Sequence, residues 1–125
     1  MPINSHKDLI AWQKGIRLCK AIYKLTEKFP KEEAYGLTSQ MRRCAVSIPS
    51  NIAEGRNRGT RKDFTQFLRI SLGSAAELET QIEIAKMLSY VTDKECDEAY
   101  GLLDEVSKMV MGLIKKFSIK LAPRT

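Results

Sequence analysis

The sequence predicts an all-α protein whose four helices form an antiparallel up-down-up-down bundle. Four segments carry apolar residues at steps of three and four, which is the spacing of an amphipathic helix. The breaks between these segments are short, and short connections join antiparallel neighbours in a bundle. No segment reads as a strand, and four prolines and seven glycines in 125 residues are too few for a many-turned β fold. A chain of this length forms one domain, so we expect a single domain over residues 1–125.

The first helix is expected over residues 8–28. Ser5 precedes Asp8 by three residues, as in a helix cap, and Phe29-Pro30 ends the segment because the residue before proline avoids the α region. An apolar a/d seam steps along this helix through Leu9, Trp12, Ile16, Cys19 and Tyr23. A second stripe, about 120° round the helix, consists of Leu18, Ile22, Leu25 and Phe29. The apolar face is wider than one core requires, so we expect a closed homo-oligomer.

The second helix is expected over residues 37–54. Its apolar stripe is Leu37, Met41, Cys44, Ala45, Ile48 and Ile52. Pro49 lies inside this pattern and predicts a kink near 45–50, because proline lacks the backbone donor of a helical residue. Gly55 is well placed as the residue that ends the helix. Another face of this helix carries a polar series that either is solvated, packs closely on a neighbouring subunit or lines a channel: Gln40, Arg43, Ser47, Ser50 and Glu54.

The third and fourth helices are expected over residues 61–89 and 93–118. Thr60 with Asp63 resembles a helix cap, and Thr92 with Glu95 matches a capping box. The third helix carries the longest apolar series of the chain, which runs through Phe64, Leu68, Ser71, Ala75, Leu78, Ile82, Ala85 and Ser89. Its middle carries small residues at positions 71 and 73–76, which allows a neighbouring helix to approach closely.

The positive charge of the chain is concentrated in one stretch. The net charge is +6, and residues 36–62 hold six basic residues against Glu54 alone. The six cations are Arg42, Arg43, Arg56, Arg58, Arg61 and Lys62. The last four lie next to the amino end of the third helix, where free amides and the helix dipole attract phosphate. We expect this region to contact RNA or DNA, and the alternative is a solvated basic loop. No aromatic residue stands between these cations in the sequence, so base stacking is not expected.

The residues that carry chemistry exclude most classes of enzyme. His6 is the one histidine in the sequence, which excludes histidine-based triads, multi-histidine zinc sites and Glu-x-x-His di-iron sites. The sequence has no Walker loop, nucleophile elbow or dinucleotide glycine fingerprint. We therefore expect no enzymatic activity, no cofactor and no metal.

The cysteines and the first residues indicate a cytoplasmic protein. The sequence has three cysteines, which are widely spaced: Cys19, Cys44 and Cys96. An odd number with wide spacing is expected for reduced thiols rather than for disulfides. Residues 1–8 lack the apolar segment of a secretory signal. No apolar run approaches the roughly 20 residues that a membrane span requires, so we expect no membrane segment.

Several motifs resemble those of a known bacterial family. They are Asp8–Trp12, Tyr35–Arg43, the run Ser-Ile-Pro-Ser-Asn-Ile-Ala-Glu-Gly at 47–55, Lys62-Asp63-Phe64, Phe67-Leu68 and Gly73–Gln81. On these motifs the chain resembles, over about residues 8–118, the four-helix-bundle proteins encoded by intervening sequences of 23S ribosomal RNA genes. Members of this family are also labelled S23 ribosomal proteins.

The resemblance implies a four-helix bundle that assembles into a ring-like homopentamer. The family is similar to the accessory protein of diversity-generating retroelements, a basic pentamer that binds nucleic acid and its reverse transcriptase. The leading hypothesis is therefore a non-enzymatic, oligomeric adaptor that binds nucleic acid with little sequence preference. The alternative is a structural or protein–protein adaptor oligomer without a nucleic-acid role, in which the same cations pair across subunits.

Overall fold

The structure, a computed structural model, describes residues 5–119 and contains four α-helices there. These are α1 (Ile10–Thr26), α2 (Leu37–Asn57), α3 (Arg61–Met87) and α4 (Asp97–Ile119). Three short 3-10 turns complete the described chain: η1 (His6–Asp8), η2 (Lys31–Glu33) and η3 (Lys94–Cys96). The described residues form no strand. The all-α four-helix bundle predicted from the sequence is therefore confirmed.

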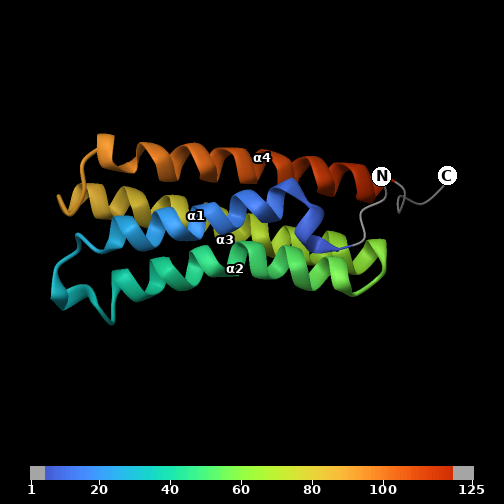
Figure 1. Ribbon diagram of the computed structural model, residues 1–125, viewed down its shortest axis with the longest axis horizontal. Coiled ribbons are helices and arrows are strands. Elements are labelled where there is room, and N and C mark those ends of the chain that lie inside the picture. Colours follow the sequence, from blue (N-terminus) through green and yellow to red (C-terminus); the bar gives the residue numbers. More distant parts are fainter. Residues whose placement is uncertain (1–4, 120–125) are drawn as a thin grey trace.

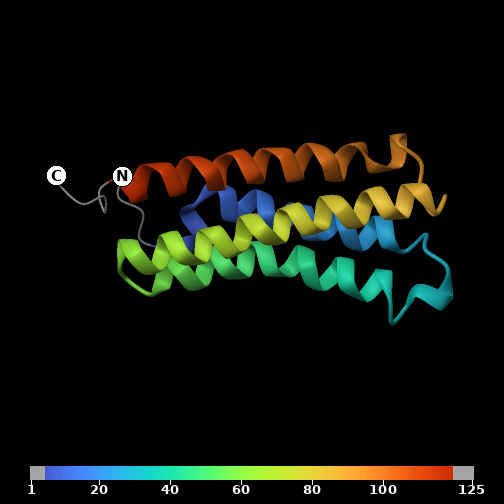
Figure 2. The ribbon, with the colours of Figure 1, turned by 180° about the vertical axis from the view of Figure 1, so that it is seen from behind.

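The four helices are arranged so that each packs against two others. The packed pairs are α1 with α2, α2 with α3, α3 with α4, and α4 with α1. In Figure 1 the helices run side by side, and Figure 2 shows the same arrangement from behind. The α2–α3 turn, the start of α1 and the end of α4 lie at one end of the bundle. The segments that contain η2 and η3 lie at the other end.

The core is built from the predicted stripes, with one exception in α1. Leu18, Ile22 and Leu25 are buried, whereas Ile16 and Tyr23 are 45% and 43% exposed. The predicted a/d seam therefore faces the core only in part: Leu9 is buried and Trp12 and Cys19 pack against the core, whereas Ile16 and Tyr23 do not. Small residues set this rotation, because a Cβ added at Gly15 would lie only 3.2 Å from the Cβ of Pro49. Part of the apolar face of α1 consequently stays outside the core.

Hydrogen bonds from α1 and α3 reach the part of α2 that contains Pro49. The helix α2 continues through this residue, and its missing N–H leaves the carbonyl of Ala45 without its usual helical donor. The thiol of Cys19 on α1 donates to that carbonyl at 3.2 Å. On the other side of α2, the Ser71 hydroxyl of α3 donates to the carbonyl of Ile48 at 3.0 Å, and the Ser47 and Ser74 hydroxyls are 2.8 Å apart. The small residues of α3 thus let α2 approach closely, as predicted, while the kink itself stays a prediction.

The hydrogen bonds at the helix ends confirm the predicted caps at Thr60 and Thr92, but two helices begin later than predicted. The Thr60 hydroxyl accepts from the Asp63 amide at 3.1 Å, and Thr92 and Glu95 form the reciprocal bonds of a capping box. Ser5 caps the short turn η1 rather than the long helix, which begins only at Ile10. The capping box likewise precedes η3, so α4 begins at Asp97 and not at 93. At its far end α3 stops at Met87 and leaves Ser89 outside, with φ of 63°.

The prediction that Gly55 ends the second helix is wrong. Gly55 lies inside α2, which continues to Asn57, and it is buried. A Cβ at this position would stand 2.7 Å from the Cβ of Phe67 and 3.3 Å from the Cα of Phe64, both on α3. Gly55 is therefore required for the close approach of two helices. The left-handed residue after the helix is Gly59, with φ of 88°.

Candidate nucleic-acid interface

The α2–α3 turn places four of the predicted cations at one end of the bundle. The left-handed backbone of Gly59 reverses the chain, and the Thr60 cap starts α3 directly afterwards. Arg58, Arg61 and Lys62 are exposed, and Arg56 is half-buried. The turn therefore presents long cationic side chains beside the amino end of α3, and the contact of these side chains with phosphate stays a prediction.

Two of these arginines also make contacts within the chain. The Nε atom of Arg58 donates to the Glu54 carboxylate at 2.8 Å, and its guanidinium lies 5.0 Å from the centre of the Phe67 ring. The guanidinium of Arg61 lies 5.3 Å from the ring centre of Phe117 on α4. An ion pair as exposed as Arg58–Glu54 is weak, so it leaves the charge of Arg58 largely accessible to a ligand.

The fold adds a cation and aromatic rings that are distant in the sequence. Lys116 of α4 is exposed, and its Nζ lies 5.6 Å from the centre of the same Phe117 ring that Arg61 faces. Two aromatic rings that are not interleaved with these cations in the sequence, Phe67 and Phe117, therefore lie beside them in the fold, while the absence of base stacking stays a prediction. The antiparallel order of the helices is the signal that could have revealed this, because it brings the end of α4 to the start of α3.

Arg42 and Arg43 lie apart from the other four. Thirteen residues of helix separate Arg43 from Arg56, which corresponds to about 20 Å along α2. Arg42 donates from Nε to the Thr26 hydroxyl at 2.8 Å, and its guanidinium lies 4.5 Å from the Tyr23 ring centre. Arg43 is exposed. The six predicted residues therefore do not form one surface: four lie at the turn, and Arg42 joins α2 to α1.

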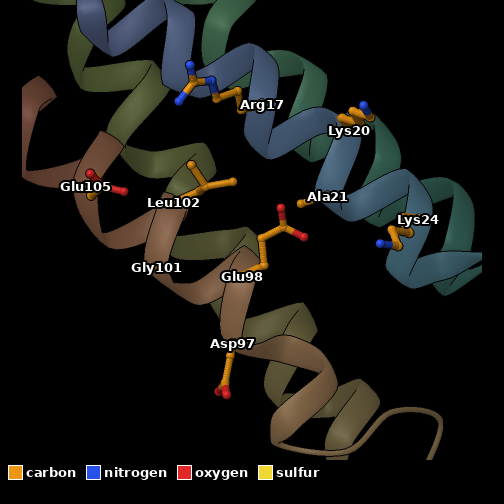
Figure 3. A pocket seen from close by; sticks show the side chains of 9 residues that line it. All are labelled: Arg17, Lys20, Ala21, Lys24, Asp97, Glu98, Gly101, Leu102 and Glu105. Carbon is orange, nitrogen blue, oxygen red and sulfur yellow. The ribbon is translucent and has the colours of Figure 1, made fainter.

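A second charged region is the groove between α1 and α4, which has a volume of about 610 Å³. In Figure 3 one wall carries Arg17, Lys20 and Lys24 of α1, and the other carries Asp97, Glu98 and Glu105 of α4. The side chain of Glu98 lies between the two helices. Because the carboxylates offset the cations across the groove, it is a poorer site for a polyanion than the α2–α3 turn.

The polar series of α2 is mostly exposed. Gln40, Arg43, Ser50 and Glu54 face solvent in the single chain, whereas Ser47 is half-buried and contacts Ser74 of α3. The structure contains one chain, so packing of this face against another subunit stays a prediction.

The three thiols are free and poorly suited to reaction. Burial raises the pKa of Cys19 to about 11, and burial together with Glu77 raises the pKa of Cys44 to about 12. The pKa of Cys96 is also raised by burial. Within residues 5–119 no group of three or more His, Cys, Asp or Glu side chains is placed to hold a metal ion. No helix in this part of the chain is both long and apolar enough to cross a membrane.

Comparison with known proteins assigns the family. The sequence profile described as 23S rRNA-intervening sequence protein matches residues 7–112, which is most of the chain. The chain belongs to the 23S rRNA-intervening sequence protein family. The resemblance carried by the run at 47–55 is thereby confirmed, and the matched residues contain α1, α2, α3 and most of α4.

A solved structure from the same group of proteins supports the fold. The chain is similar to a protein of unknown function from the S23 ribosomal protein family of Bacteroides thetaiotaomicron. The two share 25% sequence identity and superimpose with a TM-score of 0.75, covering 85% of this chain and 99% of the other. No curated protein matches the sequence significantly. This intervening-sequence protein therefore shares the fold of that S23-family protein.

Proposed function

We propose that this protein is a non-enzymatic, oligomeric adaptor that binds RNA or DNA with little sequence preference. The observation that carries the proposal is the convergence of the α2–α3 turn and the end of α4. Arg56 and Arg61 of the turn line one cavity together with Lys116, and Arg58 and Lys62 belong to the same turn. Such a cluster suits phosphate contacts, which position a strand without reading its bases.

An oligomer would strengthen this activity. In a symmetric assembly the turn would recur once per subunit, and several weak contacts on one strand would combine through effective concentration. The exposed apolar residues Ile16 and Tyr23 on α1 and Val46 on α2 support assembly, since each is more than 40% exposed in the single chain. The homopentamer implied by the family resemblance is part of the proposal.

The proposal is tested by two charge-matched variants. In the turn variant, Arg56, Arg58, Arg61 and Lys62 are replaced by Gln. The control variant replaces Arg17, Lys20, Lys24 and Lys31, four exposed cations away from the turn, and so loses the same charge. At about 50 mM salt we expect the turn variant to bind a mixed-sequence RNA at least about tenfold more weakly than the parent, and the control within about threefold. Equal losses would contradict a localised phosphate site.

The second candidate function is a protein–protein adaptor without a nucleic-acid role. It is favoured by the same exposed apolar residues, Ile16, Tyr23 and Val46, which would then contact a protein alone. If the parent binds no RNA or DNA at about 50 mM salt while it still assembles, this candidate replaces the first.

A further inference from the structure

A small cavity adjoins the cations of the α2–α3 turn. It has a volume of about 240 Å³, less than the roughly 300–1,000 Å³ of most ligand pockets, so it suits a small chemical group. Its cationic lining comes from three helices: Arg56 of α2, Arg61 of α3 and Lys116 of α4. Its apolar lining includes Leu9 and Leu113.

Two of the cations that line this cavity, Arg61 and Lys116, lie on either side of the α3–α4 contact. Arg61 and Lys116 both lie within 6 Å of the centre of the Phe117 ring. Neither cation forms an ion pair with a carboxylate among the described residues. Because both cations line the same cavity, an anion held there would be attracted to each of them.

An apolar hollow continues from the cavity along α1 and α4. It has a volume of about 400 Å³ and shares Leu9, Leu113 and Lys116 with the cavity. Its remaining lining is mostly apolar, with Ile10 and Met109, and has one carboxylate residue, Asp8, at the start of the chain segment that forms it. A cationic pocket therefore opens beside an apolar surface, with Lys116 at the boundary between them.

We propose that this site holds one nucleotide unit of a nucleic-acid strand. The phosphate lies at Arg61 and Lys116, and the base lies on the apolar surface of Ile10 and Leu113. The inference rests on the proposed function and adds to it a defined subsite, since the turn cations alone would contact only the backbone. An aromatic base buries apolar area here regardless of its identity, so the subsite is compatible with binding that tolerates many sequences.

The test compares three small ligands by titration calorimetry at about 50 mM salt. Adenosine 5′-monophosphate carries both phosphate and base, ribose 5-phosphate lacks the base, and adenosine lacks the phosphate. We expect the mononucleotide to bind at least about tenfold more tightly than either fragment, because each fragment loses one of the two contacts. If ribose 5-phosphate binds as tightly as the mononucleotide, the base contact is wrong.

A pair of neighbouring lysines provides the matched variants. Lys116→Gln removes a cation of the cavity, whereas Lys115→Gln removes the same charge from an exposed position that does not line it. We expect Lys116→Gln to weaken mononucleotide binding at least about fivefold and Lys115→Gln less than twofold. Both positions are exposed, so neither change should unfold the helix, and circular dichroism checks this.

Binding of mixed-sequence RNA, measured in parallel, separates this inference from the proposed function. If RNA binds but the mononucleotide does not, or if the two lysine variants weaken mononucleotide binding equally, the subsite is overturned and the adaptor function stands. If neither ligand binds, both are overturned.

Discussion

Arg42 illustrates how a cation predicted to contact nucleic acid can instead join two helices. Its guanidinium lies over the Tyr23 ring, and its Nε donates to Thr26, whose hydroxyl also donates to the carbonyl of Ile22 at 2.8 Å. Arg42 thereby links α2 to the last turn of α1 through a hydrogen bond and a cation–π contact. The sequence shows a charge at this position but not the ring beneath it, because Tyr23 lies nineteen residues away in another helix.

The contacts of Arg42 predict a loss of stability on substitution. Arg42→Gln should lower the free energy of unfolding by about 1 kcal/mol, since a partly exposed charged hydrogen bond and a cation–π contact are lost. Arg43→Gln is the matched control, because Arg43 is exposed and should change stability by less than about 0.5 kcal/mol. Urea unfolding at one protein concentration measures both. Equal effects would show that the contacts of Arg42 contribute nothing of their own.

The buried thiols predict slow reaction with thiol reagents in the native protein. The thiolate is the reactive form, and a pKa of about 11 for Cys19 leaves roughly one molecule in a thousand ionised at pH 8. Native labelling by a disulfide reagent should therefore be slow at pH 8 and accelerate as the pH rises toward 11. After unfolding in denaturant all three cysteines should react quickly. Rapid native labelling at pH 8 would contradict the burial described here.

At the scale of helices, the contact between α2 and α3 depends on Gly55. Gly55→Ala would place a methyl group 2.7 Å from Phe67 and should cost about 1–3 kcal/mol of stability through overpacking. Gly73→Ala is the control, because Gly73 is an exposed residue of α3 with nothing within 4 Å of the added methyl group. The control should gain up to about 1 kcal/mol from helix propensity. Thermal and urea unfolding report both changes, and a neutral Gly55→Ala would mean that the two helices can separate freely.

The positions of the helices can be predicted from the local sequence, but the face that each helix turns toward the core cannot. Steps of three and four residues placed all four helices, and Thr60 marked the start of α3, because these signals depend on neighbouring residues alone. The prediction for Gly55 was wrong because the sequence does not distinguish a glycine that ends a helix from a glycine that allows a neighbouring helix to pack closely. The stripe of α1 that faces the core could not be chosen either, since Gly15 meets Pro49 only after folding.

At the scale of the molecule, the topology decides which charges and rings meet. Lys116 and Phe117 could be assigned to the end of the last helix from sequence, but their position beside Arg61 follows only from the antiparallel order. The six predicted cations accordingly lie in two places. Arg43 lies about 20 Å along α2 from Arg56, so Arg42 and Arg43 are not part of the turn. The sequence therefore predicted the cations of the α2–α3 turn, but it did not predict that Lys116 and Phe117 of α4 lie beside them.

The exposed apolar residues predict an assembly larger than one chain. Light scattering at micromolar concentration should give several times 14.2 kDa. Replacing Ile16 and Val46 by Ser should shift the mass toward that of the single chain, because both side chains would lose burial against a partner. Ile84→Ser, at a similarly exposed position on α3, is the control and should leave the mass unchanged. A parent protein of 14.2 kDa in solution would overturn the oligomeric part of the account.

The central claim, that the α2–α3 turn contacts phosphates, is tested most directly by the salt dependence of RNA binding. Each phosphate contact should contribute about −0.7 to −0.9 to the slope of log affinity against log salt concentration, so four contacts give a slope near −3. We expect a linear fall of about this slope for the parent and a clearly shallower one for the variant that lacks Arg56, Arg58, Arg61 and Lys62. An affinity that does not change with salt, or the same slope in both proteins, would contradict the account.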